Sequence, residues 1–272
     1  MSLEKKNKLV VCVVDTETTM KNEHSYLVYD FAYAIGNVYD SYCEPKERNF
    51  LINDVLDRPE YFLYSTKKIL DEGERMVYSY DERYGKALRR RTRNGVANGV
   101  DWDFAMKMFW EDCSTTGVDV IVAYNLAFDL RALRNTCDQI NDKRFRLPNG
   151  VQKLCLQDLC ATKVINNDFH NWFNPLDEKL KNQFTTDNDN ISYSAECIFR
   201  YWFDNYYYNE QHTALRDVRM EWKLIVKCFE RWDKDIRKKF IDNVRSVSWS
   251  DVNKIKSATQ KMKLREKRKL AC

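Results

Sequence analysis

Residues 8–19 read KLVVCVVDTETT, and this stretch decides the fold. After Lys8, the next six residues are apolar and include four valines. A short run of this kind is typical of a β-strand whose two faces are both covered by other elements. The run therefore indicates a buried strand in a sheet flanked by helices, which is the α/β class.

Two acidic residues, Asp15 and Glu17, stand where this strand is expected to end. In a strand, residues i and i+2 point to the same face, so the two carboxylates are expected side by side. Carboxylates this close repel each other and raise one pKa unless a cation neutralises them. Mg²⁺ and Mn²⁺ prefer such oxygen ligands. The pair favours a divalent-metal site, with solvated acids in a turn as the alternative.

Four further stretches are expected to complete a five-stranded mixed sheet. Two of them, 27–35 and 38–43, are rich in aromatic and β-branched residues and flank a Gly-Asn pair, which favours an antiparallel hairpin with a tight turn. The other two are the apolar run 118–124 and the short segment 151–157. Apolar residues at helical spacing predict the surrounding helices. These helices are expected over residues 101–113, 126–140 and 193–240.

Two more motifs carry functional residue types. The first, YNLAFD, places Asp129 in the first turn of a helix after a buried strand, where an acid can also simply complement the helix dipole. The second, HTALRD, places His212 five residues before Asp217. On a regular helix this spacing separates two side chains by about 140°. The two residues share a site only if His212 lies on the loop before the helix.

The motifs VVDTETT, YNLAFD and HTALRD, in this order and at these separations, resemble those of the DEDDh (DnaQ-like) 3′→5′ exonucleases, which have a ribonuclease H-like fold. The resemblance implies a general base, His212, that removes a proton from the attacking water. It also implies two divalent metal ions, Mg²⁺ or Mn²⁺, and release of nucleoside 5′-monophosphates. The metal-binding acids that it implies are Asp15, Glu17, Asp129 and Asp217.

Residues beside these motifs are expected to contact the terminal nucleotide. The threonines are expected to reach its sugar or phosphate, and the asparagine and phenylalanine are expected to line the base pocket. These residues are Thr16, Thr18, Thr19, Asn125 and Phe128. Core packing is the alternative for Phe128. Met20 replaces the glycine usual in the family, and Tyr124 replaces a common histidine, but neither departure removes a metal ligand.

The resemblance covers roughly residues 8–43 and 118–232, and the rest is longer than a minimal family core. We expect one exonuclease domain over residues 1–245, followed by a basic C-terminal extension over 246–272. Insertions in this domain are expected at about 44–117 and 166–190.

Basic and aromatic residues give two further interpretations. Six arginines and lysines lie within residues 83–93 and could meet phosphates, or could form a solvated helix face. Tyr201, Trp202 and the Tyr206–Tyr208 run precede His212 and could stack on bases, with helix packing as the alternative.

The composition excludes several protein classes. No apolar run approaches the roughly 20 residues needed to span a bilayer, and the charged start lacks a secretory signal. The nine cysteines are scattered without a CxxC pair, which favours reduced thiols. We therefore expect an intracellular, cytoplasmic protein that does not contact membranes. The Asn- and Tyr-rich, Gly-poor composition favours a virus- or phage-encoded chain.

The expected binding partner is a single-stranded 3′ end, with DNA slightly favoured over RNA. A polymerase or other replication protein is a second expected partner, because no polymerase domain is evident. Two rival hypotheses remain: a non-catalytic nucleic-acid-binding or polymerase-associated module with the same fold, and an adaptor in which the motifs coincide by chance. Divalent-metal binding that disappears in Asp15→Ala would separate the enzyme from both rivals.

Overall fold

The computed structural model describes residues 8–22, 25–40, 43–62, 85–90, 98–164, 167–185, 192 and 194–231. The chain divides into two compact units. One unit contains residues 1–154 and 210–223, and the other contains residues 155–209 and 224–272. The expected basic extension over 246–272 lies outside the described residues, and the single domain over 1–245 stays a prediction.

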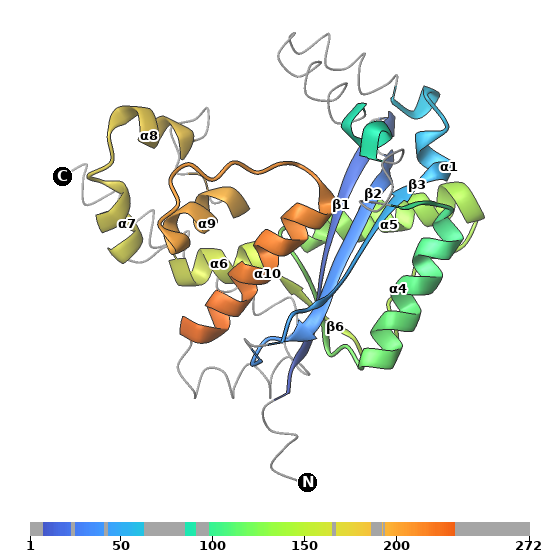
Figure 1. The fold of residues 1–272 in the computed structure, drawn as a ribbon, viewed down its shortest axis with the longest axis horizontal. Helices are drawn as coiled ribbons and strands as arrows, with labels where there is room; N and C mark the ends of the chain where they lie inside the picture. Colours follow the sequence, from blue (N-terminus) through green and yellow to red (C-terminus); the bar gives the residue numbers. More distant parts are fainter. Residues whose placement is uncertain are drawn as a thin grey trace, which may run out of the picture. The chain divides into compact units, whose positions relative to one another are not determined.

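The first unit is built around a mixed sheet of six strands in the order β4-β3-β2-β1-β5-β6. Figure 1 labels four of them, β1, β2, β3 and β6. The long strand β1 (Val10–Asn22) pairs antiparallel with β2 (Ser25–Asn37) and parallel with β5 (Val120–Ala123). The strand β6 (Gln152–Cys155) follows β5 at one edge. The expected α/β class and mixed sheet are confirmed.

The other edge of the sheet belongs to the 44–117 insertion. The strand β3 (Lys46–Ile52) pairs antiparallel with β2, and the short strand β4 (Asn98–Val100) pairs parallel with β3. The short helix α1 (Asn53–Leu56) follows β3 directly. β4 is a strand beyond the expected five, and its three residues are too few to produce a recognisable alternation in the sequence.

The expected strand over residues 38–43 is wrong. The residues described there form a turn and a bend, and the Gly-Asn pair belongs to the end of β2. Gly36 is needed for close packing, because a Cβ on it would lie 2.8 Å from the ring of Trp222. Asn37 supports the turn, since its Oδ1 accepts hydrogen bonds from the backbone N–H groups of Leu9 (3.1 Å) and Tyr39 (3.2 Å).

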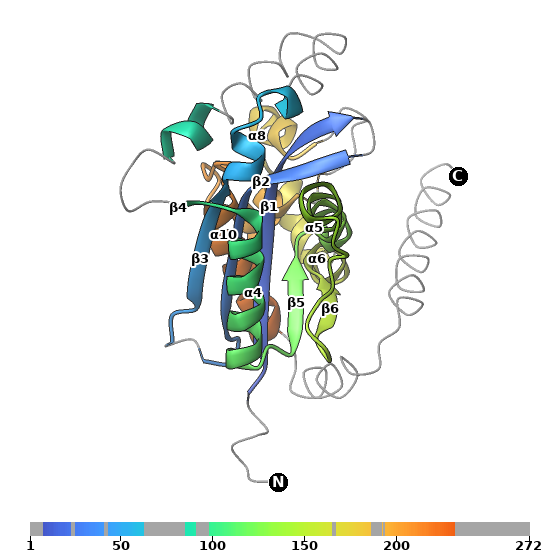
Figure 2. The same cartoon turned by 90° about the vertical axis from the view of Figure 1, so that its right-hand side faces the viewer.

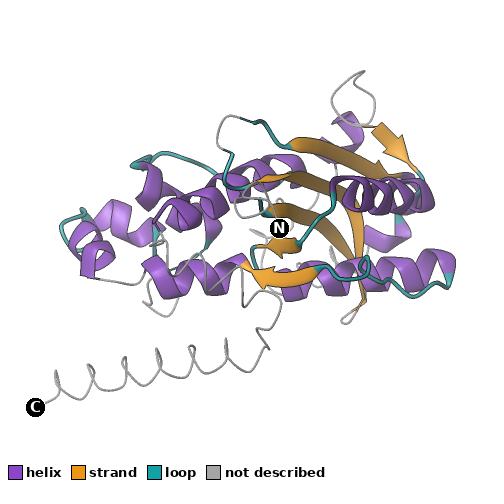
Figure 3. Cartoon of the chain, turned by 90° about the horizontal axis from the view of Figure 1, so that it is seen from below, coloured by secondary structure: helices purple, strands orange, loops and turns teal. Residues whose placement is uncertain are grey.

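Helices cover both faces of the sheet. Phe31 and Tyr33 of β2 pack on Phe109 of α4 (Trp102–Thr116), with ring centroids 5.6 and 5.4 Å apart. Gly36 lies on the other face of β2 from Phe31 and Tyr33, and it packs against Trp222 of α10 (Ala214–Arg231). Because side chains alternate along a strand, α4 and the start of α10 lie on opposite faces. Figure 2 shows α4 lying along the strands, and Figure 3 shows the strands in orange with helices in purple beside them.

The remaining helices agree with the sequence predictions in part. The helix α5 (Leu126–Asn141) agrees with the prediction over 126–140. In the second unit the helices are α6 (Leu156–Val164), α7 (Asn167–Phe173), α8 (Glu178–Gln183) and α9 (Ala195–Phe203). Of these four, only α9 lies in a predicted helix, and α7 and α8 lie within the expected 166–190 insertion. Residues 204–213 are not helical, so the expected helix over 193–240 is interrupted before His212.

Most aromatic side chains suggested for base stacking pack within the second unit. The Trp172 indole N–H donates to the Tyr206 hydroxyl at 3.0 Å, and the two rings stack. Tyr208 packs on Phe199, and Trp202 is buried. In contrast, Tyr207 is 90% exposed.

Eight cysteines lie in the described parts of the chain, none of these eight is in a disulfide, and only Cys43 among them is exposed. The reduced state of the thiols stays a prediction. In the parts of the chain that the structure describes, no helix has the length and apolar character required for a membrane span.

Candidate active site

The two acids of the first motif lie on the central strand and face α10. β1 continues through both of them, because its pairing with β2 places Asp15 opposite Ala32 and Glu17 opposite Asp30. Cross-strand partners in an antiparallel pair share a face. This is the Gly36 face, on which α10 packs. The pairing with β5 ends at Val13, so both acids lie just beyond the end of that neighbouring strand.

Asp129 reaches β1 from the first turn of α5. The turn that precedes it depends on Asn125, whose φ of 71° is left-handed, a conformation that asparagine tolerates better than most residues. Asp129 is 3% exposed, and its Oδ1 accepts a hydrogen bond from the Thr16 hydroxyl at 2.8 Å. The turn at Asn125, between β5 and α5, therefore places the buried carboxylate of Asp129 beside the middle of β1.

His212 lies on the loop before α10, which is the placement that the spacing of five requires. Its φ is 49°, and its side chain is exposed. α10 begins at Ala214, and the backbone N–H of Asp217 donates to the Thr213 carbonyl at 3.1 Å. Because His212 lies on this loop and not on the helix, a ligand atom of its side chain can lie within 4.8 Å of one from Asp217.

Three of the predicted residues meet closely enough to hold one ion. One ligand atom from each of Glu17, His212 and Asp217 lies within 4.8 Å of the other two. Asp217 is 4% exposed, and its Oδ1 is buried without a hydrogen-bond partner in the structure. A buried polar atom without a partner is costly. The oxygen-rich donor set and this oxygen both fit a hard divalent cation.

The carboxylates strongly affect one another's ionisation. Burial raises the pKa of Asp15 well above its usual range, and the charges of Asp129, Glu221 and Asp217 raise it further. Burial also raises the pKa of Asp129 to about 7, against the lowering effect of the Thr16 hydrogen bond. Together these shifts describe a site with excess negative charge, which a bound cation would neutralise.

Asp217 belongs to the same charged group. Burial raises its pKa to about 8, and the charges of Glu210, Glu17 and Asp30 add to this effect. Asp15, Glu17, Asp129 and Asp217 therefore interact electrostatically, while the tight cluster contains Glu17, Asp217 and His212.

Sequence reasoning missed two buried acids beside this group. Glu221 is 3% exposed and lies one helical turn after Asp217. Its position in the apolar stripe with Val218 and Ile225 was a readable signal, because an acid there breaks the stripe. Asp30 is 1% exposed, and it gave no such signal because it lies within a long strand.

The predicted substrate-binding residues have varied surroundings. Thr19 is fully buried, and its hydroxyl donates to the Tyr61 carbonyl at 2.9 Å. Thr18 is half-buried, and Asn125 is exposed. Phe128 is half-buried and meets Tyr26 edge to face, with ring centroids 5.1 Å apart. Nucleotide contact by these residues, and by Thr16, stays a prediction.

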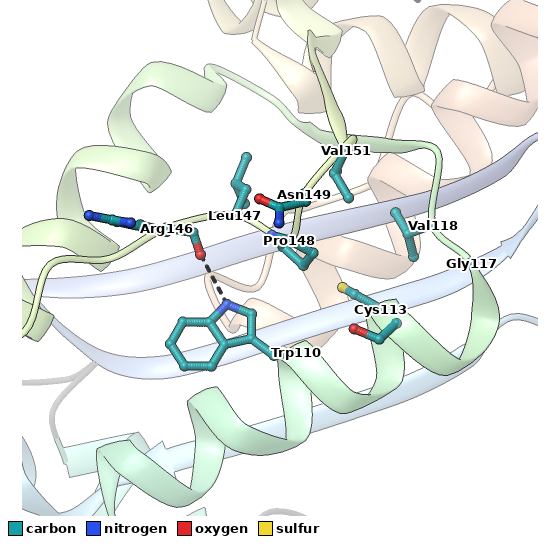
Figure 4. Close-up of a pocket in the computed structure, with 10 residues that line it drawn as sticks. Trp110, Cys113, Gly117, Val118, Arg146, Leu147, Pro148, Asn149 and Val151 are labelled. Carbon is teal, nitrogen blue, oxygen red and sulfur yellow. Dashed lines mark hydrogen bonds between the residues drawn. The ribbon is translucent and has the colours of Figure 1, made fainter.

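A separate pocket of about 620 Å³ contains none of the predicted site residues. It lies between the end of α4 and residues 146–151, where the Trp110 indole N–H donates to the Arg146 carbonyl at 3.0 Å (Figure 4). Gly117 and Val118 line it just before β5, whereas the acids lie beyond the other end of that strand. The candidate site is therefore the acidic group.

No protein-family model and no curated protein matches the chain. Among solved structures, the chain is similar to cell-death related nuclease 4 (CRN-4), with 12% identity, a TM-score of 0.46, and coverage of 82% of this chain and 64% of that one. It is similar to a full-length 3′-exonuclease, with 10% identity, a TM-score of 0.48 and 83% coverage of both chains. It is also similar to exonuclease I from Methylocaldum szegediense, with 15% identity, a TM-score of 0.49, and coverage of 86% of this chain and 43% of that one.

Proposed function

We propose that the chain is a metal-dependent 3′→5′ exonuclease that releases nucleoside 5′-monophosphates from single-stranded DNA or RNA. The observation that carries this proposal is the meeting of Glu17, His212 and Asp217 within 4.8 Å, from segments almost 200 residues apart in the sequence. The interaction of Asp15 and Asp129 with the same group supports it. The alternative, solvated acids in a turn, does not explain acids that are buried and that come from β1, α5 and α10.

The chain's own residues suit divalent ions as cofactors. Asp15, Glu17, Asp129 and Asp217 would hold two Mg²⁺ or Mn²⁺ ions, which prefer carboxylate oxygens. Bound ions of this kind lower the pKa of water and neutralise charge on the scissile phosphate. The raised carboxyl pKa values mean that binding must displace protons at neutral pH, so affinity should increase with pH.

His212 has the position and chemistry of a general base. Its exposed side chain can accept a proton from an attacking water, which is a common task of histidine in acid–base catalysis. The carboxylates of Glu17 and Asp217 lie beside it and would stabilise the imidazolium that forms. Water attack forms one P–O bond as the bond to the 3′-oxygen breaks, and the departing oxygen takes up a proton.

The direct test uses 5′-labelled single-stranded DNA and RNA of one sequence, with Mg²⁺ or Mn²⁺. We expect a ladder that shortens from the 3′ end, with DNA cut slightly faster than RNA. Asp15→Ala and His212→Ala should abolish it, whereas Asp138→Ala, an exposed acid on α5, should not. Absence of cleavage of both substrates with both metals would overturn the proposal and favour a non-catalytic binding module.

A further inference from the structure

Glu221 is the buried acid for which the proposed mechanism has no use. It lies four residues after Asp217 on α10, so the two side chains lie on the same side of the helix. Its neighbours on this side include Val218 and Ile225, which are fully buried. A carboxylate in such surroundings is expensive unless a specific interaction retains it.

Glu221 makes a hydrogen bond with a backbone group of the YNLAFD motif. Its Oε2 accepts a hydrogen bond from the backbone N–H of Tyr124 at 3.1 Å, across 97 residues of sequence. Tyr124 is the first residue after β5, and Asn125 follows it in the left-handed conformation from which α5 starts. Asp129 lies in the first turn of that helix.

This hydrogen bond therefore connects the supports of two predicted metal ligands. One end of it lies on the helix that carries Asp217, and the other end lies on the turn that aims Asp129. The N–H of Tyr124 precedes the helix, and Glu221 gives it an acceptor inside the protein. A movement of α10 relative to this turn would break the bond and change the separation of the two carboxylates.

We propose that Glu221 is a positioning residue that fixes the turn bearing Asp129 against the helix bearing Asp217. It acts through its oxygen as a hydrogen-bond acceptor, and its negative charge is not required. The inference rests on the proposed function only in assuming that these two acids bind a metal ion. The competing role, direct metal coordination by Glu221, would require the carboxylate itself.

Two substitutions separate these roles. Glu221→Gln keeps an oxygen that can accept from Tyr124 but removes the charge, whereas Glu221→Ala removes both. Glu230→Ala, at an exposed acid farther along α10, serves as the matched control. The readouts are Mn²⁺ affinity by isothermal titration calorimetry, thermal midpoint, and cleavage of labelled single-stranded DNA.

We expect Glu221→Gln and Glu230→Ala to bind Mn²⁺ within about threefold of the wild type. Glu221→Ala should bind Mn²⁺ and cleave DNA about 10–100-fold less well, as is usual when the support of a metal ligand is removed. If Glu221→Ala does not fold, the glutamine variant still tests the idea. A loss of Mn²⁺ affinity of tenfold or more in Glu221→Gln would overturn it, and so would wild-type affinity in Glu221→Ala. A wild-type chain that binds Mn²⁺ but cuts no nucleic acid would refute the exonuclease and leave this inference standing.

Discussion

The Thr16 hydroxyl donates a 2.8 Å hydrogen bond to Oδ1 of Asp129, and both side chains are buried. The bond joins β1 to the first turn of α5 across 113 residues of sequence. Thr16 faces away from Asp15 and Glu17 because side chains alternate along the strand. The threonine between the two acids therefore orients a third acid.

Removal of this hydroxyl should weaken metal binding. We expect Thr16→Val, which keeps the side-chain shape, to lower Mn²⁺ affinity about tenfold, because Asp129 loses the donor that orients it. Thr16→Ser should bind almost as well as the wild type. Titration calorimetry measures both, and Thr19→Val is the control, since that buried hydroxyl bonds to Tyr61 instead. Equal affinity in Thr16→Val and the wild type would contradict this role.

The stability of the metal-free protein should fall as pH rises. Burial raises the pKa of Asp129 to about 7 and that of Asp217 to about 8, whereas an unfolded Asp titrates near about 3.9. Between about pH 4 and pH 8 the folded state therefore binds more protons than the unfolded state. The free energy of unfolding decreases with pH wherever this holds.

Thermal unfolding in chelator should show this dependence directly. We expect the midpoint to fall by several degrees between pH 5 and pH 8, and Asp217→Asn to reduce the slope. Added Mn²⁺ should raise the midpoint more at pH 8 than at pH 5, because it binds the deprotonated carboxylates. A midpoint that stays level or rises with pH in chelator would show that these acids are not buried together.

Arg90 should matter for stability more than for substrate binding. Its guanidinium donates to Asp30 Oδ2 at 2.5 Å and to the Asn49 amide oxygen at 2.6 Å, and the Arg90 and Asp30 side chains are only 18% and 1% exposed. Asp30 also lies 3.4 Å from the backbone N–H of Ala214, where α10 begins. Arg90→Ala would leave this carboxylate buried without its cation, at a cost of about 3 kcal/mol.

Urea unfolding measures this cost. Arg89→Ala is the control, because Arg89 is exposed and lies on the same short helix over residues 85–90. We expect a change below about 0.5 kcal/mol for Arg89→Ala. If the two variants are equally stable, the ion pair contributes nothing to the free energy of unfolding. Because Arg90 is paired with Asp30, we do not expect it to contact phosphate. Arg83, Arg91 and Arg93 of the same basic stretch lie outside the described residues.

Arg131 is a better candidate for a contact with nucleic acid. Arg131 lies on α5, two residues after Asp129. Its guanidinium carbon lies 5.6 Å from the ring centre of Tyr26 and 5.8 Å from that of Phe128. Arg131 is exposed, so its charge can meet a phosphate of the strand. We expect Arg131→Ala to weaken single-stranded DNA binding and reduce the salt dependence of log Kd by about one phosphate contact.

Fluorescence anisotropy at several salt concentrations tests this contact, with Asp15→Ala as the background to prevent cleavage. Arg146→Ala is the control, because this exposed arginine borders the pocket that contains no site residue. An unchanged salt slope in the Arg131 variant would exclude a phosphate contact there.

The sequence by itself determined the parts of the protein that depend on local pattern. The apolar run before Asp15 indicated β1, because only a strand covered on both faces is apolar throughout. The α/β class, α4 and α5 followed from periodicity in the same way, and the spacing of His212 and Asp217 required the loop that the structure contains. The motif order supplied the candidate acids themselves.

Only the tertiary structure decided features that depend on residues distant in sequence. Gly36 indicated a turn in the sequence, yet the ring of Trp222, from a helix 178 positions later in the chain, is what requires a glycine there. The sequence also did not reveal the partners of Glu221 and Arg90, because Tyr124 and Asp30 are far away along the chain. Local periodicity reports which face of an element is buried, whereas the identity of the neighbour is determined only when the sheet and helices pack together.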